Sequence, residues 1–353
     1  MDKLAKLREM LPSLGVDGML ITGATNRRYM TGFTGSAGVV LISPAEAKLI
    51  VDFRYVEQAA EQAPEYEVVR IRDSLPDQVA LEAEKMGIAR LAFERDHITF
   101  GAYEEYSGKV KARLTPAAGV VESLRMIKTE QEIECLRKAA DIADRTFSRV
   151  LELIRPGVAE KEIADEMESI MRQLGADSSG FAPIIASGWR AALPHGLASD
   201  KKIEKGDAVI LDFGACYRGY RSDMTRTVAV GDPGDRIRQI YEIVLDTQRS
   251  CLARLGPGVS CREVDETTHE AVRLRGYGEH FGHGSGHGIG LDIHEEPFFS
   301  PKSDKTLQPG MVVTFEPGIY LPGLGGVRIE DDVLITAEGA EVITRSPKEL
   351  IVL

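Results

Sequence analysis

The stretch that decides the fold is Leu211–Thr227, which reads LDFGACYRGYRSDMTRT. Asp212 closes an apolar run that begins at Ala208, and Asp223 follows later, after two glycines and two tyrosines. This pattern predicts a strand, a turn region and a returning strand, with one carboxylate on each strand. A carboxylate inside an apolar strand costs free energy unless another group compensates its charge. The two aspartates therefore mark a place where such compensation is expected.

A second stretch, Met311–Glu330, repeats this pattern about one hundred residues later with the sequence MVVTFEPGIYLPGLGGVRIE. Glu316 closes its apolar run, and Glu330 ends the return. Taken alone, two aspartates on one hairpin are usually a solvated pair or turn formers. Two such units in the same order are hard to explain as surface decoration. Together they predict four acidic ligands that converge on metal.

The repeat extends beyond the carboxylates. The segment Pro156–Ile163 has a partner in Pro257–Val264, and Gly206 and Gly310 each stand six residues before the first carboxylate of their unit. The same order at a near-constant offset indicates a helical pair plus a strand hairpin, used twice. We expect residues 125–353 to form one domain of two related halves. These halves would pack about a pseudo-twofold axis, with the carboxylates between them.

Residues 1–122 predict a separate domain. Its apolar runs alternate with helical patterns, which favours a mixed or parallel sheet and an α/β fold class. The glycine-rich stretch Thr31–Gly38 lacks the Walker and dinucleotide-binding patterns, so we interpret it as a turn region. Strands are expected at 18–22, 38–43, 48–52 and 91–93, an opening helix that ends near Gly15, and further helices at 77–86, 129–153 and 159–174.

The composition argues against several classes of function. A formal net charge of −12 does not suit a nucleic-acid or anionic-membrane partner. No window approaches the ~18 apolar residues of a transmembrane helix, and the N-terminus has the pattern of an amphipathic helix rather than a signal peptide. The four cysteines show neither a CxxC pair nor zinc spacing, which favours reduced thiols. We expect a soluble, cytoplasmic protein.

Four of the seven histidines lie in the glycine-rich stretch His280–His294. Glycines at alternate positions from 282 to 290 make a helix implausible there. In extended backbone His283 and His287 would face the same side, with room for a close approach where Cβ atoms are absent. The alternative is a flexible glycine loop with incidental histidines. Beside four inward carboxylates, we favour a binding pocket.

Carboxylate-rich coordination with one imidazole suits a catalytic pair of Mn²⁺, Co²⁺, Fe²⁺ or Zn²⁺ better than a structural zinc site. Such a pair lowers the pKa of water enough to give a nucleophile near neutral pH. Arg328 stands two residues before Glu330 and would face the same side of a strand, where it can orient a ligand or bind an anion. A surface position is the alternative for Arg328. His195, taken alone, is more often structural than catalytic.

Together, these stretches resemble the pita-bread metallopeptidases that cleave Xaa-Pro bonds, prolidase and aminopeptidase P. The similarity spans essentially the whole chain, as a creatinase-type N-terminal domain (1–122) and a duplicated catalytic domain (125–353). It implies two divalent metal ions (Mn²⁺ first, with Co²⁺ or Zn²⁺ as alternatives), a homodimer, and peptide substrates with proline at the second position. The matching stretches are LDFGACYRGYRSDMTRT, ALPHG, GHGIGLDIHEEP, FEPGIY and GGVRIEDD.

The resemblance also implies a role for each matching residue. Glu316 could accept the proton of water in addition to binding metal. The implied metal ligands are Asp212, Asp223, His287, Glu316 and Glu330, and the implied catalytic residues are His195, His283, His294, Arg328 and Glu316.

One departure concerns the substrate. Several prolidases that resemble this chain have an arginine directly after the HExP segment, suited to the C-terminal carboxylate of a dipeptide. Here Pro297 is followed by Phe298 and Phe299. Loss of that cation would weaken selection for dipeptides, so the sequence favours an Xaa-Pro aminopeptidase over an Xaa-Pro dipeptidase.

Three rival interpretations are weaker. A methionine aminopeptidase would leave the N-terminal domain unexplained. Creatinase-like enzymes share both domains but work without metal, which a complete ligand set argues against. A binding module of this fold that has lost catalysis predicts missing ligands, and none of the matching ligands is missing.

Overall fold

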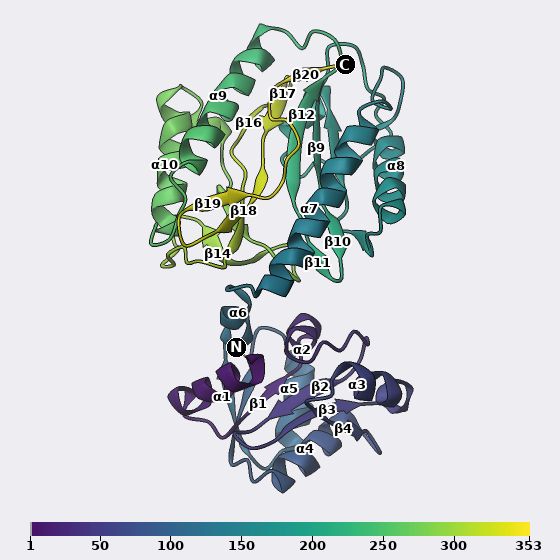
Figure 1. Ribbon diagram of the computed structural model, residues 1–353, viewed down its shortest axis with the longest axis vertical. Helices are drawn as coiled ribbons and strands as arrows, with labels where there is room; N and C mark the ends of the chain where they lie inside the picture. Colours follow the sequence, from purple (N-terminus) through teal and green to yellow (C-terminus); the bar gives the residue numbers. More distant parts are fainter. Residues whose placement is uncertain (1) are drawn as a thin grey trace. The chain divides into compact units, whose positions relative to one another are not determined.

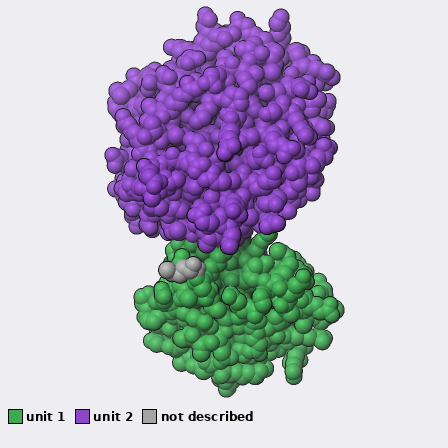
Figure 2. Space-filling model, in the orientation of Figure 1, with its two compact units in different colours: residues 1–125 green, residues 126–353 purple. Residues whose placement is uncertain are grey.

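The computed structural model describes residues 2–353, which divide into two compact units (Figure 2). The first ends at Arg125, and the second is Met126–Leu353. The helix α6 (Val120–Arg125) occupies the place where the sequence predicts the domain boundary. Among the described residues, no helix combines the length and the apolar character needed to cross a membrane.

The first unit is built on a six-stranded mixed sheet with the order β4-β3-β2-β1-β5-β6 (Figure 1). Its pairs are antiparallel at β1–β2 and β2–β3 and parallel at the other three, so of the mixed or parallel sheet that the sequence favours, the mixed form is present. The strands are β1 (Gly18–Ile21), β2 (Val39–Ile42), β3 (Ala47–Val51), β4 (Glu67–Arg70), β5 (Arg90–Glu94) and β6 (Arg113–Ala117). The helices are α1 (Lys3–Leu14), α2 (Ala24–Thr31), α3 (Val56–Gln62), α4 (Leu75–Lys85) and α5 (Phe100–Lys109), with a 3₁₀ turn η1 (Phe53–Tyr55).

In the second unit, the predicted repeat is visible as two sets of elements in the same order. The first set has α7 (Glu130–Val150) and α8 (Glu160–Gln173), which pack on a four-stranded sheet through a core that includes Phe147, Met167 and Leu211. Figure 1 shows α7 and α8 on one side of the strands, and α9 (Asp235–Leu252) and α10 (Cys261–Leu274) of the second set on the other. The first sheet has the order β20-β12-β9-β8, from β8 (Ile184–Ser187), β9 (Ala208–Phe213), β12 (Met224–Ala229) and β20 (Ile351–Val352).

The second sheet has the order β14-β13-β15-β18-β19 and packs against α9 and α10. Backbone landmarks recur between the halves: Gly206 and Gly310 have φ angles of 96° and 88°, which favour glycine. The isolated bridges Ala159–Lys202 and Ser260–Thr306 also correspond. The strands are β13 (Gly286–Gly288), β14 (Glu295–Phe299), β15 (Val312–Phe315), β18 (Asp331–Ile335) and β19 (Ala340–Val342).

Each predicted turn region is itself a hairpin. Between β9 and β12 lie β10 (Ala215–Tyr217) and β11 (Tyr220–Arg221), and between β15 and β18 lie β16 (Gly318–Leu321) and β17 (Gly325–Arg328). The outer strands β9 and β12 pair antiparallel, as do β15 and β18. Because the outer strands pair, the residue that begins the return strand lies near the end of the first strand. The second carboxylate of each unit is therefore close to the first. The remaining short elements are β7 (Ser178–Ser179), η2 (Gly188–Ala192) and η3 (Gly278–His280).

Candidate metal centre

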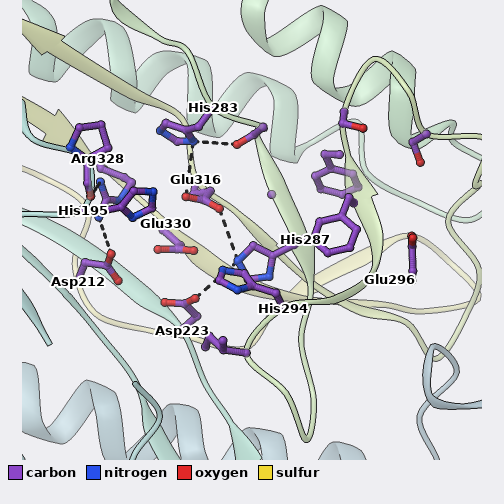
Figure 3. Close-up of a pocket in the computed structure, with 18 of the residues that line it drawn as sticks. His195, Asp212, Asp223, His283, His287, His294, Glu296, Glu316, Arg328 and Glu330 are labelled. Carbon is purple, nitrogen blue, oxygen red and sulfur yellow. Dashed lines mark hydrogen bonds and ion pairs between the residues drawn. The ribbon is translucent and has the colours of Figure 1, made fainter. Parts of the chain in front are cut away.

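The four carboxylates of the two repeat units meet in one cavity of about 620 Å³ in the second unit. Asp212 lies near the end of β9 and Asp223 directly before β12. Glu316 directly follows β15, and Glu330 directly precedes β18. The sheets therefore bring together four acidic side chains that are up to 118 positions apart in the chain. Figure 3 shows these side chains pointing toward one another.

His287, from β13, completes the group. Its Nε2 atom lies 3.8 Å from Asp223 Oδ2 and 3.6 Å from Glu316 Oε1. One ligand atom each of Asp223, His287 and Glu330 lies within 4.8 Å of the others, a spacing that can hold a metal ion. The five residues proposed as ligands from the sequence thus line one cavity (Figure 3).

Burial and mutual repulsion disfavour the ionised forms of these carboxylates, so nearby positive charge would stabilise them. It raises the pKa of Asp223 well above its ordinary value, and the charges of Glu330 and Asp212 raise that pKa further. Burial likewise raises the pKa of Glu330, with Glu316 and Asp212 adding to the effect. Oδ1 of Asp212 and Oδ1 of Asp223 are buried and have no hydrogen-bond partner among residues 2–353. Divalent cations would satisfy these oxygens, so the donor set fits the metals that the sequence predicts.

His287 is poised as a neutral ligand. Burial lowers its pKa to about 4. Its Nδ1 lies 3.0 Å from the carbonyl oxygen of Gly288, which can only accept a hydrogen bond, so Nδ1 carries the ring proton. The lone pair of Nε2 therefore faces Asp223 and Glu316, which is the tautomer a metal ligand needs.

Arg328 is part of the cavity and not a surface residue. Its side chain is 3% exposed, and Nη2 donates to Asp212 Oδ2 at 2.5 Å. Nη1 donates to the Tyr320 hydroxyl at 2.8 Å and to the Pro194 carbonyl oxygen at 3.2 Å. This geometry fixes the carboxylate of Asp212 and ties it to the loop that carries His195.

Two supporting residues were missed from the sequence. Thr225 donates its hydroxyl to Glu330 Oε2 at 2.6 Å, and Asp332 accepts the backbone N–H of Asp223 at 3.0 Å. Each stands two positions after a carboxylate, on the same side of its strand. That spacing was the available signal, but Thr and Asp on a strand have too many other roles for the signal to be specific.

The other three histidines also line the cavity. The His294 ring lies 4.5 Å from the His287 ring, and burial lowers the pKa of His294. His283 donates from Nδ1 to the Gly284 carbonyl oxygen and accepts at Nε2 from Tyr320 at 2.9 Å. His195 is exposed at the cavity wall. All four predicted histidines are therefore gathered at one place (Figure 3).

The wall beyond His294 differs from what the sequence suggested. Phe298 lines the cavity with 41% of its surface exposed, whereas Phe299 is 1% exposed. Lys302 lines the same cavity. The absence of an arginine directly after Pro297 therefore does not leave this wall without a cation, because Lys302 supplies one a few residues later.

A second group of possible ligands, Glu94, His97 and Glu122, lies in the first unit. Glu94 already accepts hydrogen bonds from the backbone N–H groups of Thr22 and Gly23, at 2.6 and 2.7 Å. Asn26 donates to Glu94 and Glu122 as well. Because its carboxylates are satisfied by donors, we interpret this group as a structural polar network.

Comparisons with known proteins agree with this site. The family model described as metallopeptidase family M24 matches residues 134–337, and the creatinase/prolidase N-terminal domain matches residues 3–127.

Three solved structures are closely similar. The Xaa-Pro dipeptidase from Bacillus anthracis is 53% identical, with a TM-score of 0.99 over 100% of this chain and 99% of that one. The prolidase from Pyrococcus horikoshii is 39% identical, with a TM-score of 0.94 over 99% and 100%. An X-Pro aminopeptidase from Thermotoga maritima is 38% identical, with a TM-score of 0.90 over 97% and 99%.

Proposed function

The chain belongs to metallopeptidase family M24, and from that membership we propose that it hydrolyses the peptide bond between an N-terminal residue and a following proline. The observation that carries this proposal is the cavity in which four carboxylates and a neutral imidazole face one another. Similar structures named Xaa-Pro dipeptidase, prolidase and X-Pro aminopeptidase support proline as the second residue of the substrate.

We propose that Asp212, Asp223, His287, Glu316 and Glu330 hold two divalent cations, with Mn²⁺ the first candidate. When bound, such cations supply Lewis acidity and lower the pKa of water. The ligand set favours an ion that accepts oxygen donors and one nitrogen, a condition that Co²⁺ and Zn²⁺ also meet.

Side chains of the cavity have separate roles in the proposed reaction. Glu316, which lines the cavity beside His287, accepts the proton of the attacking water. His294 lies at the cavity beside His287 and donates a hydrogen bond to the carbonyl oxygen as negative charge develops there. His195, which also lines the cavity, contacts the substrate, and His283 is a further histidine of the cavity lining.

Two substrate classes fit the cavity. The phenylalanine after Pro297 favours longer peptides and thus the Xaa-Pro aminopeptidase predicted from the sequence. Lys302 favours dipeptides, because its ammonium group can pair with a C-terminal carboxylate. We place the dipeptide first, since Lys302 restores the cation whose absence carried the aminopeptidase argument. The Xaa-Pro aminopeptidase is the second candidate.

The deciding experiment compares kcat/KM for Ala-Pro and for an Arg-Pro-Pro peptide, using metal-stripped protein with and without added Mn²⁺. We expect release of the N-terminal residue only when proline follows and only with metal. Lys302→Met should lower kcat/KM for Ala-Pro by about tenfold and leave the longer peptide unchanged. Lys202→Met, at an exposed position, is the control. If Lys302→Met and Lys202→Met change kcat/KM for Ala-Pro equally, Lys302 does not select dipeptides and the Xaa-Pro aminopeptidase becomes the first candidate.

The metal assignment is tested with Asp212→Asn and His287→Ala. Both variants should lose metal content and turnover while thermal unfolding shows a folded protein. Full activity in either would overturn the ligand assignment. Retention of metal by the unaltered chain without cleavage of any Xaa-Pro peptide would favour the binding-module interpretation. The homodimer stays a prediction, which light scattering of the purified chain would test.

A further inference from the structure

His195 sits on a loop whose large apolar side chains are mostly exposed, although its Ala191 is buried against Ile210 and Tyr320. The loop runs from Ser187, at the end of β8, to Ser199. Three of its large apolar side chains, Trp189, Leu193 and Leu197, are 56%, 44% and 57% exposed. Burial of Ala191 anchors the first part of the loop, but the large side chains next to His195 add little burial that would hold His195 itself in place. Another interaction is needed to place His195 at the cavity.

That interaction comes from Glu160, the first residue of α8, which is fully buried. Its Oε1 accepts the backbone N–H of Ser187 at 2.7 Å and the Ser187 hydroxyl at 2.9 Å. Its Oε2 accepts the backbone N–H of Ser199 at 3.1 Å and the Ser199 hydroxyl at 2.7 Å. Each oxygen of one carboxylate thus holds one end of the loop.

Two arginines add hydrogen bonds to the loop: Arg190 links Glu160 to the middle of the loop, and Arg328 links the loop to the metal centre. Arg190 donates from Nε to Glu160 at 3.2 Å and from Nη2 to the Leu197 carbonyl oxygen at 2.6 Å. Arg328, which holds Asp212, donates to the Pro194 carbonyl oxygen directly before His195. The segment that bears His195 is therefore fixed at both ends, across its middle and against the metal centre.

We propose that Glu160 is a positioning residue for the reaction: by closing the 187–199 loop at both ends, its carboxylate places His195 where it can contact the substrate. This role rests on the proposed function, because it acts through the contribution of His195 to turnover. A carboxylate is needed, since two oxygens must accept four hydrogen bonds from two chain segments and a fifth from Arg190.

Glu160→Gln tests the role with little change of shape. An amide has one oxygen, so its NH₂ group would meet the N–H and O–H donors of one loop end. We expect kcat/KM to fall about tenfold or more. The matched control is Glu162→Gln, which removes the same charge from an exposed position of the same helix. It should leave kcat/KM unchanged.

A double-mutant cycle separates positioning from general damage. If Glu160 acts through His195, Glu160→Gln should change kcat/KM little in a His195→Ala background. Full additivity of the two changes, or no effect of Glu160→Gln on an active enzyme, would overturn the proposal. Absence of Xaa-Pro cleavage by the unaltered chain would instead be a failure of the proposed function.

Limited proteolysis tests the position of the loop even if the chain does not cleave Xaa-Pro peptides. Chymotrypsin can cut after the exposed Trp189, and mass spectrometry can follow cleavage within residues 188–198. We expect cleavage there to be about tenfold faster in Glu160→Gln than in Glu162→Gln. Should Glu160→Gln fail to fold, Ser199→Ala weakens one end of the loop and keeps the charge of Glu160 paired with Arg190. Unchanged proteolysis and unchanged kcat/KM in that variant would equally overturn the proposal.

Discussion

At the scale of single residues, Arg328 holds together groups from four parts of the chain. Its guanidinium donates to Asp212, to the hydroxyls of Tyr320 and Thr225, and to the Pro194 carbonyl oxygen. A lysine keeps the charge but has one nitrogen, so it cannot reach these partners from one planar group. We expect Arg328→Lys to lower kcat/KM about 10- to 100-fold. Arg155→Lys, at an exposed position, is the control, and equal kinetics of the two variants would contradict the assignment.

The identity of the acidic residues could be predicted, but their support could not. Asp212 and Glu316 stand at the ends of apolar strands, where an isolated charge is costly, and the repeat pairs each with a second carboxylate. The spacing of Thr225 two positions after Asp223 is too common to be specific, and Glu160 carries no such local signal. Their roles come from contacts with residues 105 and 27 or more positions away, which only the folded chain brings near.

At the scale of elements, the glycines of the 282–290 stretch have unequal roles. A Cβ atom on Gly286, in β13, would lie 2.1 Å from the backbone oxygen of Thr314, whereas one on Gly282 would meet nothing within 4 Å. Gly286→Ala should therefore push β13 from β15 and displace His287. We expect a loss of about 1–3 kcal/mol in the free energy of unfolding, together with reduced metal binding.

The matched control for that change is Gly282→Ala in the same stretch. It should retain metal binding and the midpoint of thermal unfolding, as measured by titration calorimetry and differential scanning calorimetry. Similar losses in both variants would show that chain flexibility, and not the close approach of two strands, accounts for the glycines.

Some strands of the first unit and the short inner hairpins of the second could not be predicted from the sequence. The buried strands β1, β2, β3 and β5 each contain a short apolar run, from which the sequence predicts them. The edge strands β4 and β6 have exposed, mixed residues, and β6 contains Pro116, so periodicity did not reveal them. The inner hairpins β10–β11 and β16–β17 were merged into turns, because their strands are only two to four residues long.

At the scale of the whole molecule, the metal centre opposes folding when no cation is present. Burial and mutual repulsion raise the pKa values of Asp223, Glu330 and Glu316, so the metal-free fold binds protons that the unfolded chain releases. Burial also raises the pKa of Asp332. Bound divalent cations would remove this burden and stabilise the native state by about 2.7 kcal/mol at a free concentration one hundred times Kd.

The sign of the pH effect follows from these shifts. For Glu316, the ordinary pKa of 4.5 rises to about 8, so its protonation favours the metal-free fold at low pH and that stability is lost as pH rises toward 8. His283 and His287 act in the opposite sense, because their pKa values fall from 6.5 to about 4. Their stabilising effect grows as pH rises from about 4 to 6.5 and levels off above pH 6.5. Between pH 6.5 and 8 the carboxyl groups therefore dominate among the shifted groups of the site.

We accordingly expect the Tm of the metal-free protein to fall as pH rises from 6.5 to 8, and the Tm of the Mn²⁺-loaded protein to fall much less. The loaded site keeps its carboxylates ionised at both pH values, so folding no longer takes up protons there. Differential scanning calorimetry in chelator and in excess Mn²⁺ measures both trends. Glu316→Gln should flatten the metal-free trend, since it removes one of the shifted groups. An equal fall with and without Mn²⁺ would place the titrating groups outside the metal centre.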